Sequence, residues 1–317
     1  MYCRQDTGRG GDVEIFYQGT DITDMVQVNA CIVRDTAAGR CDSLEIEFGN
    51  AAGWYSWGPE EDDKIIVVHN GYDSGVMYVN KIMPEDGKYR IMAASLPCKA
   101  RAKGNASFYG QTIEEIVRSC AMVSGMEYQL FGIDGAAVIP YIERENEGCA
   151  AFLNRFLMLE SAVLKCVNGK YAAIDIKYAQ GMEAGQTVEL MANQEGSKYR
   201  RDGTKYRGVT IKTPYASAYA QDAAVGSTHA ALTINDLPAM NDIQAGRWAR
   251  GKLLWLNRQC EKVTVQNSFN AGLTAMARID VTGDTDATGE WLVEEAEHDF
   301  INLTTTAILR RCLWSIQ

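Results

Sequence analysis

The segment that comes nearest to a metal site lies between residues 284 and 295. Carboxylates and hydroxyls alternate from Asp284 to Glu290, Gly289 stands at the sixth position and Glu295 at the twelfth. This is the spacing of the oxygen ligands in a calcium-binding loop. The residues on either side read as strands, however, and a plain acidic hairpin loop explains the same pattern. Whether residues 284–295 bind calcium therefore stays open at this point.

Other residues could carry out acid–base chemistry. Four consecutive carboxylates run from Glu60 to Asp63, and one carboxylate can raise the pKa of its neighbour. An acidic loop leading into a strand at Ile65 explains them more simply. The three histidines, His69, His229 and His298, lie far apart and in no ligand or catalytic motif. We therefore predict no catalytic residue, no cofactor and no metal, and a protein that is not an enzyme.

Basic residues gather in one place, interleaved with tyrosines: Lys198–Arg201, Lys205, Tyr206 and Arg207. Tyrosines among basic residues suit stacking on a nucleic-acid strand. The whole chain, however, has 31 basic and 41 acidic residues, a net charge of −10, which repels phosphate. The cluster is better interpreted as a surface loop that docks on an acidic partner.

Cysteine usage and hydropathy limit the compartment. The nine cysteines are odd in number and include no CxxC pair, which argues against a disulfide framework and a zinc site. We interpret them as reduced, mostly small core residues of a protein made in a reducing compartment. No run of about 18 apolar residues occurs, so no membrane anchor is expected. No apolar segment follows the first residues, so no secretory signal is expected.

The elements that position these residues are mostly strands in the first third. A length of 317 residues favours two or three domains. Apolar and polar residues alternate over 43–48, and residues 64–68 form a short β-branched run. Runs 76–83 and 88–95 flank Pro84-Glu85-Asp86-Gly87 and predict an antiparallel hairpin. Such strands are typical of a small barrel or sandwich.

The middle third changes to mixed α and β. Thr112 and Glu115 fit a capping box, which predicts a helix over 112–124 that ends at Gly125. A second helix is predicted over 149–161. Asn168-Gly169, which favours a type I′ turn, predicts a hairpin after it.

The last third returns to strands around one helix. Strands are predicted over 207–212, 228–234, 262–268, 274–281, 290–296 and 302–309. The helix is predicted over 239–259, and Trp248 and Trp255 lie on it, although Gly246 and Gly251 weaken it. The fold class is thus mainly β with an α+β insert: two small related β-barrels flanking a small α+β region. The domains are a first barrel (1–100), the α+β region (101–180) and a second barrel with the helix (181–317).

Several segments follow one another in a familiar order. They are Leu44–Phe48, Gly75–Val79 and Tyr89–Ser95 in the first third, Gln111–Val117 and Ala151–Phe156 in the middle, and Trp291–Val293, His298 and Thr304–Arg310 at the end. Together they resemble phage late control D proteins, the baseplate hub proteins of phage tails, which are related to the hub part of type VI secretion spikes. Residues 184–235 fit this pattern less well.

The resemblance implies a structural role. Such hubs are homotrimers with two related barrels in each chain, and the six barrels match the sixfold tail tube to the threefold spike. Implied partners are the tail tube protein, the central spike protein, the tape-measure protein and other baseplate proteins. The implied location is a virion or phage-tail-like particle, such as a tailocin or another contractile injection system, assembled in the bacterial host cytoplasm. Residues 1–100 hold 16 acidic and 9 basic residues, 16 − 9 = 7 excess negative charges, which would suit the lining of a bore.

Two other functions stay open beside the hub. A tail-associated cell-wall hydrolase would need a catalytic carboxylate or a histidine–cysteine pair in a cleft, and the sequence shows neither. A calcium-dependent binding module would use residues 284–295, and its melting temperature would respond to calcium and to chelator.

Overall fold

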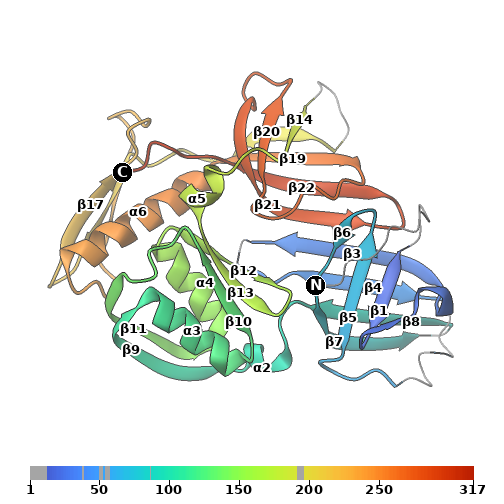
Figure 1. Ribbon diagram of the computed structural model, residues 1–317. Helices are drawn as coiled ribbons and strands as arrows, with labels where there is room; N and C mark the ends of the chain where they lie inside the picture. Colours follow the sequence, from blue (N-terminus) through green and yellow to red (C-terminus); the bar gives the residue numbers. More distant parts are fainter. Residues whose placement is uncertain (1–12, 38, 50–52, 54–57, 86, 191–195) are drawn as a thin grey trace.

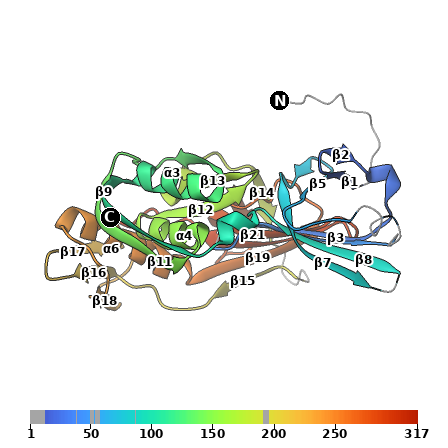
Figure 2. The ribbon, with the colours of Figure 1, turned by 90° about the horizontal axis from the view of Figure 1, so that it is seen from below.

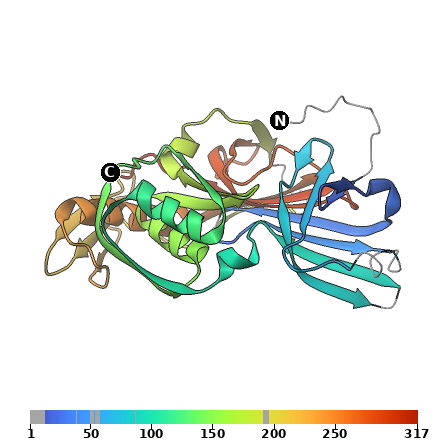
Figure 3. The same cartoon turned by 60° about the horizontal axis from the view of Figure 1, so that its bottom comes forward.

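The computed structural model describes residues 13–37, 39–49, 53, 58–85, 87–190 and 196–317. Strands dominate and gather in two lobes that lie side by side, with an α+β region along one flank (Figure 1). From other directions the molecule is elongated, with the α+β region at one end and the strands of the first lobe at the other (Figure 2, Figure 3). The mainly β class with an α+β insert is confirmed.

The N-terminal lobe is a curved antiparallel sheet. Its elements are β1 (Glu14–Tyr17), β2 (Thr20–Asp21), the 3-10 helix η1 (Thr23–Met25), β3 (Val28–Thr36), β4 (Ser43–Phe48), β5 (Lys64–His69), β6 (Tyr72–Asp73), β7 (Met77–Glu85) and β8 (Lys88–Ala94). The strand order is β3-β4-β8-β7-β5-β1-β2. The predicted alternation on β4 is confirmed, because Leu44, Ile46 and Phe48 are buried in the lobe core.

The hairpin of β7 and β8 is confirmed, with a shorter turn than predicted. The two strands pair as far as Glu85 and Lys88, so Pro84 lies within β7. Only Asp86, which is outside the described residues, and Gly87 at φ +74° remain between them. Two-residue loops match the twist of antiparallel strands. Proline is tolerated here because, among the described residues, β7 pairs with β5 at Met77 and Tyr78 alone, and no described strand pairs with this side of Pro84.

The C-terminal lobe has its own apolar core. Its strands are β14 (Gln186–Glu189), β15 (Lys198–Arg201), β19 (Glu261–Ser268), β20 (Arg278–Thr282), β21 (Gly289–Asp299) and β22 (Thr304–Arg311). Val265, Trp291 and Leu309 are fully buried in this core. The strand predicted over 274–281 begins only at Arg278, because Ala275 and Met276 pack into the joint between regions instead.

Both lobes belong to one sheet, a connection that the prediction of two small related barrels did not include. The last residues of β21 pair with the last residues of β3, from Glu295↔Thr36 to Asp299↔Ile32. This pairing joins the lobes into a 14-stranded sheet that runs from β15 to β2, and the described residues form no closed barrel. The physical reason is that β21 and β3 offer each other an open edge, and pairing satisfies the backbone groups of both.

The α+β region lies against this sheet and contains three small sheets. Its strands are β9 (Gly104–Thr112), β10 (Glu127–Phe131), β11 (Val138–Glu147), β12 (Ala162–Val167), β13 (Lys170–Asp175), β16 (Gly208–Lys212), β17 (Ser217–Gln221) and β18 (Ala231–Ile234). Its helices are α2 (Cys98–Arg101), α3 (Ile113–Ser124), α4 (Cys149–Leu159), α5 (Ile176–Gln180) and α6 (Asp242–Arg258). The sheet orders are β10-β13-β12, β11-β9 and β17-β16-β18.

Local signals in this region are confirmed in detail. Thr112 accepts from the backbone N–H of Glu115, and Glu115 accepts in return from the N–H of Thr112, which completes the capping box of α3. Gly125 ends the helix in the left-handed conformation, at φ +69°. Asn168 and Gly169 both have positive φ and join β12 to β13 as the predicted hairpin.

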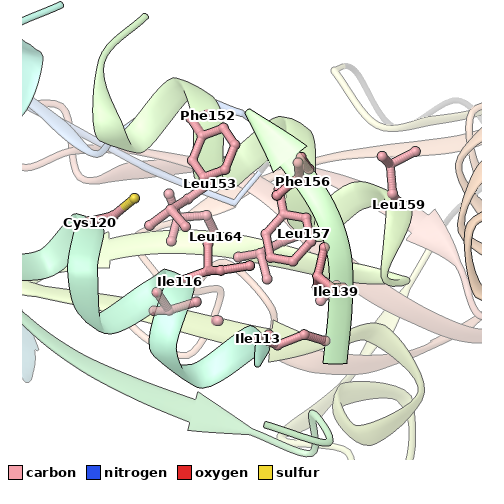
Figure 4. Packing of buried hydrophobic residues seen from close by; sticks show 14 of the residues in the cluster. Ile113, Ile116, Cys120, Ile139, Phe152, Leu153, Phe156, Leu157, Leu159 and Leu164 are labelled. Carbon is pink, nitrogen blue, oxygen red and sulfur yellow. The ribbon is translucent and has the colours of Figure 1, made fainter. Parts of the chain in front are cut away.

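The core of the α+β region reaches further along the chain than its predicted range, 101–180. Helices α3 and α4 pack together with Phe152, Leu153, Phe156 and other apolar residues between them (Figure 4). The same core includes Ile211 of β16 and Trp248 of α6. Gly251 permits this packing, because a Cβ there would lie 2.2 Å from the carbonyl oxygen of Leu159. The predicted division at 100 and 180 stays a prediction.

Candidate functional site

The three regions meet at a buried joint, which we call the junction. Its apolar residues come from the segment directly after β3, from the α+β region and from the C-terminal lobe: Ala37, Val163, Ile176, Ala179, Leu254, Ala275, Met276, Leu292 and Cys312. Apolar burial at such a joint holds the regions as one body. Because residues of all three regions meet at the junction, we treat it as the candidate site.

A buried ion cluster lies at the junction. Lys165 of β12 donates from Nζ to Asp35 of β3 and to Asp42, at 3.3 Å from Oδ1 and 3.2 Å from Oδ2. The three side chains are only 12%, 6% and 4% exposed. The second oxygen of Asp35 accepts from the N–H of Ala275 at 3.1 Å. Asp42 also accepts from the N–H of Thr36 at 2.9 Å. The cluster therefore ties all three regions together.

One lysine serves two carboxylates here, and this arrangement affects the pKa of Asp42 and of Lys165. Burial raises the pKa of Asp42 to about 6. The charge of Lys165 opposes this shift, and the charge of Asp35 adds to it. Burial alone would lower the pKa of Lys165, but the two carboxylates outweigh it and hold that pKa above its usual value. Lys165 therefore stays charged, and the cluster works as a fixed electrostatic joint.

Two of the three histidines lie beside the joint, in an aromatic cluster. His69 of β5 stacks on Phe300, with ring centroids 5.2 Å apart, and meets Phe269 edge-on at 4.9 Å. His298 of β21 lies 4.4 Å from the ring of Tyr72. Phe269 and Phe300 belong to the C-terminal part of the chain yet pack into the core of the N-terminal lobe. The aromatic cluster thus packs the C-terminal lobe against the N-terminal lobe.

The environment of His298 suits packing rather than proton transfer. The ring is fully buried, and its Nδ1 lies 3.0 Å from the hydroxyl oxygen of Thr305. Burial lowers its pKa to about 4. His298 is therefore neutral at physiological pH. His229, the third histidine, lies elsewhere and lines a pocket together with Lys205 and Glu261.

The calcium-loop residues are not brought together. The carboxylate of Asp284 accepts from the N–H groups of its own loop, Asp286 at 2.8 Å and Ala287 at 2.9 Å. Glu290 and Glu295 lie on one extended strand, β21, and five residues of strand span ~17 Å. No group of three or more histidine, cysteine or acidic side chains is placed to hold a metal within the described part of the chain.

The acidic run Glu60–Asp63 serves as a structural loop. Asp63 accepts from Tyr17, Gln18 and the N–H of Glu60. Asp62 accepts at 2.6 Å from the N–H of Cys98, which begins α2. Because these carboxylates bind the loop to its surroundings, the interpretation as an acidic loop fits the geometry.

The basic cluster is a neutralised sheet edge. Residues 198–201 form β15, which pairs with β19 at one end of the 14-stranded sheet. Arg200 lies 2.7 Å from Asp202, and Lys205 lies 2.7 Å from Glu261. Tyr199 packs edge-on against Trp291, with centroids 6.3 Å apart. These side chains are therefore largely engaged within the chain.

The acidic residues of β4 are also paired. Glu47 accepts salt bridges from Lys88 and Arg90 of β8, each at 2.9 Å, and Arg90 reaches Glu45 at 3.8 Å. The bonds from Lys88 and Arg90 lower the pKa of Glu47 to about 2. Part of the negative charge of the first hundred residues is thus balanced locally.

Sequence reasoning missed the ion cluster. A signal was present, because Lys165 interrupts the apolar run Val163–Val167, and a charge in a buried strand needs a partner. The identity of its partners, Asp35 and Asp42, could not be read from the sequence, since they lie more than a hundred residues away.

None of the helices in the described ranges is long and apolar enough to cross a membrane.

Comparisons with known proteins identify solved structures that have a similar fold. No family model and no curated protein matches the chain. Among solved structures, a tail protein from Neisseria meningitidis has a TM-score of 0.73 at 11% identity, covering 96% of this chain and 98% of that one. A 43 kDa tail protein of prophage MuSo2 from Shewanella oneidensis also has a TM-score of 0.73, at 12% identity, covering 95% and 98%.

A secretion protein shares the fold as well. A type VI secretion component from Escherichia coli, described as structurally similar to the phage T4 tail proteins gp27 and gp5, has a TM-score of 0.55 at 14% identity. The match covers 95% of this chain and 80% of that one. The chain therefore has the fold of phage tail proteins and of type VI spike-related proteins. The resemblance noted in the sequence is confirmed at the level of fold.

Proposed function

We propose that this chain is a structural baseplate hub protein of a phage tail or phage-tail-like particle. It works as a homotrimer, and the six β lobes of three chains adapt the sixfold tail tube to the threefold spike. The observation that carries the proposal is the fold match over nearly the full length of two phage tail proteins. The role is structural, without catalytic residues.

The internal architecture supports such a role. The two lobes of one chain lie side by side in one continuous sheet, joined at β3 and β21. A hub that transmits load between a tube and a spike needs lobes with a fixed relative position. The ion cluster and the interlocked aromatic rings supply this rigidity, because both tie residues of different regions together.

The proposed partners follow from this role. They are two further copies of the chain, the tail tube protein, the central spike protein, the tape-measure protein and other baseplate proteins. The proposed location is the tail baseplate of a particle assembled in the cytoplasm of a bacterial host. Acidic residues of the N-terminal lobe would line the bore and repel the phosphates of passing DNA.

Light scattering tests the proposal. The mass is measured alone and after co-expression with the spike protein from the same gene cluster. We expect 3 × 35.0 = 105 kDa for the chain alone, or a 3:3 complex with the spike. Trimerisation only in the presence of the spike would also support a hub, since the spike would act as its template. A monomer that does not bind the spike would contradict the proposal.

A further inference from the structure

Two buried cysteines of the α+β region contact each other across α3 and α4. Cys120 lies on α3 and Cys149 is the first residue of α4, and they are 2% and 1% exposed. Both residues belong to the same apolar core, and the thiol of Cys120 faces the sulfur of Cys149 as a hydrogen-bond donor. Cys120 turns toward the side of α4 that carries Phe152 and Leu153 (Figure 4). Two thiols in contact are the starting geometry for a disulfide.

A buried cation lies against the same sulfur. Arg144 of β11 is 7% exposed and donates from Nη1 to the Sγ of Cys149. Its Nε has no hydrogen-bond partner in the described structure. The carboxylate of Glu147 nearby is engaged with Arg155, at 2.5 Å. A buried guanidinium needs a counter-charge, and the sulfur of Cys149 is the group placed to supply it.

The remaining surroundings also favour a thiolate at Cys149. Cys149 is the first residue of α4 and therefore lies at the positive end of the helix dipole. The N-cap residue, Gly148, supplies no side-chain cap there. A hydrogen bond from Ser124 also favours the thiolate of Cys149, and Tyr171 of β13 donates to the hydroxyl oxygen of Ser124 at 2.8 Å. The bonds from Cys120 and Ser124 and the charge of Arg144 hold the pKa of Cys149 at about 6, below its usual value.

We infer that Cys120 and Cys149 form an oxidation site, a dithiol that a small peroxide converts into a disulfide bridging α3 and α4. The thiolate of Cys149 attacks one oxygen of the peroxide, so that an S–O bond forms, the O–O bond breaks and hydroxide leaves. Its bond to Cys149 and its burial raise the pKa of Cys120, so Cys120 keeps its proton until this point. The thiol sulfur of Cys120 then attacks the sulfenic sulfur of Cys149. An S–S bond forms, the S–O bond breaks, and water leaves with the proton of Cys120.

Burial defines the class of oxidant. Both sulfurs are almost inaccessible, so a small peroxide can reach them more readily than a bulky disulfide such as oxidised glutathione. In a reducing compartment both thiols stay free, and in an oxidising one the bridge closes. This inference does not depend on the proposed hub function.

Other described cysteines differ from this pair. Cys41 and Cys166 interact with each other, but burial raises the pKa of both thiols, and the nearby charge of Asp42 adds to this. Burial also raises the pKa of Cys31 and Cys312. These thiols therefore stay protonated, and among the described residues they do not face a thiol whose pKa is lowered. Cys149 is the described cysteine with a lowered pKa and a thiol partner in contact.

Peptide mapping of the intact protein tests the inference. The folded protein is treated with dilute hydrogen peroxide, quenched with catalase, alkylated in denaturant and digested with trypsin. Cleavage after Arg118, Arg144 and Arg155 gives peptides 119–144 and 145–155, each with one cysteine. We expect these two peptides joined by a disulfide as the first oxidation product, and alkylatable thiols to fall from nine to 9 − 2 = 7. A reductant should reverse both changes.

Variants separate the roles of the residues. Cys120→Ser should stop at a sulfenic acid on Cys149 that a cyclic 1,3-diketone traps, and Cys149→Ser should not oxidise at this site. Arg144→Gln should slow the loss of thiols at pH 7 several-fold, whereas Arg118→Gln on the exposed face of α3 should leave the rate unchanged. Circular dichroism checks that each variant is folded, and the mapping of the wild-type protein stands without them.

The outcomes are unambiguous. The inference would be overturned if the first disulfide formed between other cysteines. It would also be overturned if nine thiols stayed free under peroxide treatment that oxidises the thiol of a control peptide. Over-oxidation of Cys149 without the 119–144 to 145–155 cross-link would overturn it as well.

Discussion

Two adjacent residues of β3, Arg34 and Asp35, make cross-region ion pairs on opposite faces of the sheet. Arg34 points outward and pairs with Glu297 of β21 at 2.7 Å, with both side chains about two-fifths exposed, at 38% and 40%. Asp35 points inward to Lys165 at the junction and is 6% exposed. Both pairs span regions of the chain, and they differ mainly in burial.

This difference determines what each pair contributes. Water screens the Arg34–Glu297 pair, and exposed pairs of this kind contribute at most ~1 kcal/mol. At the junction the low dielectric makes each charge dependent on its partner, because an unpaired buried charge is costly. The buried cluster therefore fixes which regions meet and in what geometry, while the exposed pair adds only slightly to a contact that backbone pairing already makes.

The largest effect is expected from removing the shared cation. Lys165→Met leaves Asp35 and Asp42 buried without a counter-charge, and we expect the free energy of unfolding to fall by about 3–5 kcal/mol. Urea denaturation followed by tryptophan fluorescence measures the change.

A matched control comes from the next strand. Lys170 of β13 pairs with Glu127 at 3.2 Å but is exposed, so Lys170→Met should cost no more than about 0.5 kcal/mol. Adding Asp35→Asn and Asp42→Asn to Lys165→Met should restore a large part of the lost stability, since no buried charge then remains. Equal effects of Lys165→Met and Lys170→Met would contradict the comparison.

Two buried groups near the junction are expected to give opposite pH dependences. The pKa of Asp42 is raised from 3.8 to about 6, so the folded state binds the extra proton in this window. Its contribution to stability therefore falls as the pH rises from about 4 to about 6. The pKa of His298 is lowered from 6.5 to about 4, so the unfolded state binds the extra proton. Its contribution rises as the pH increases from about 4 to 6.5.

Single substitutions should uncover each slope. The free energy of unfolding of Asp42→Asn minus that of the wild type should rise by about 2–3 kcal/mol as the pH increases from about 4 to about 6. The reason is that the variant lacks the contribution of Asp42, which falls over this interval. For His298→Gln the same difference should fall by about as much over this interval. Urea midpoints at several pH values measure both differences, in which the other titrating groups cancel. Profiles that run parallel to the wild type would show that burial at the junction does not control these groups.

The smallest effect is expected on the exposed face. A double-mutant cycle with Arg34→Ala and Glu297→Ala should give an interaction energy of at most ~1 kcal/mol, and high salt should reduce it further. Chemical denaturation at low and high salt checks this. An interaction energy above about 2 kcal/mol would mean that exposure does not set the contribution of these ion pairs.

Local structure could be predicted where neighbouring residues suffice to specify it. The capping box of Thr112 and Glu115 and the turn at Asn168-Gly169 depend on backbone geometry within a few residues, and both are confirmed. The helix weakened by Gly251 exists because that glycine lets α6 approach α4 at Leu159, a contact that sequence reasoning could not weigh. The candidate site could not be predicted in the same way, since its residues lie on segments far apart in the chain.

The sequence by itself determined the mainly β class, the α+β insert and the resemblance to tail hub proteins, because alternation, caps and turn residues act over short distances. Only the tertiary structure decided that β3 pairs with β21, so that the two lobes share one continuous sheet. It also decided that Lys165 meets Asp35 and Asp42, and that Cys149 meets Cys120 and Arg144. The physical reason is that open strand edges and buried charges require partners, but only the folded chain selects which ones lie within reach.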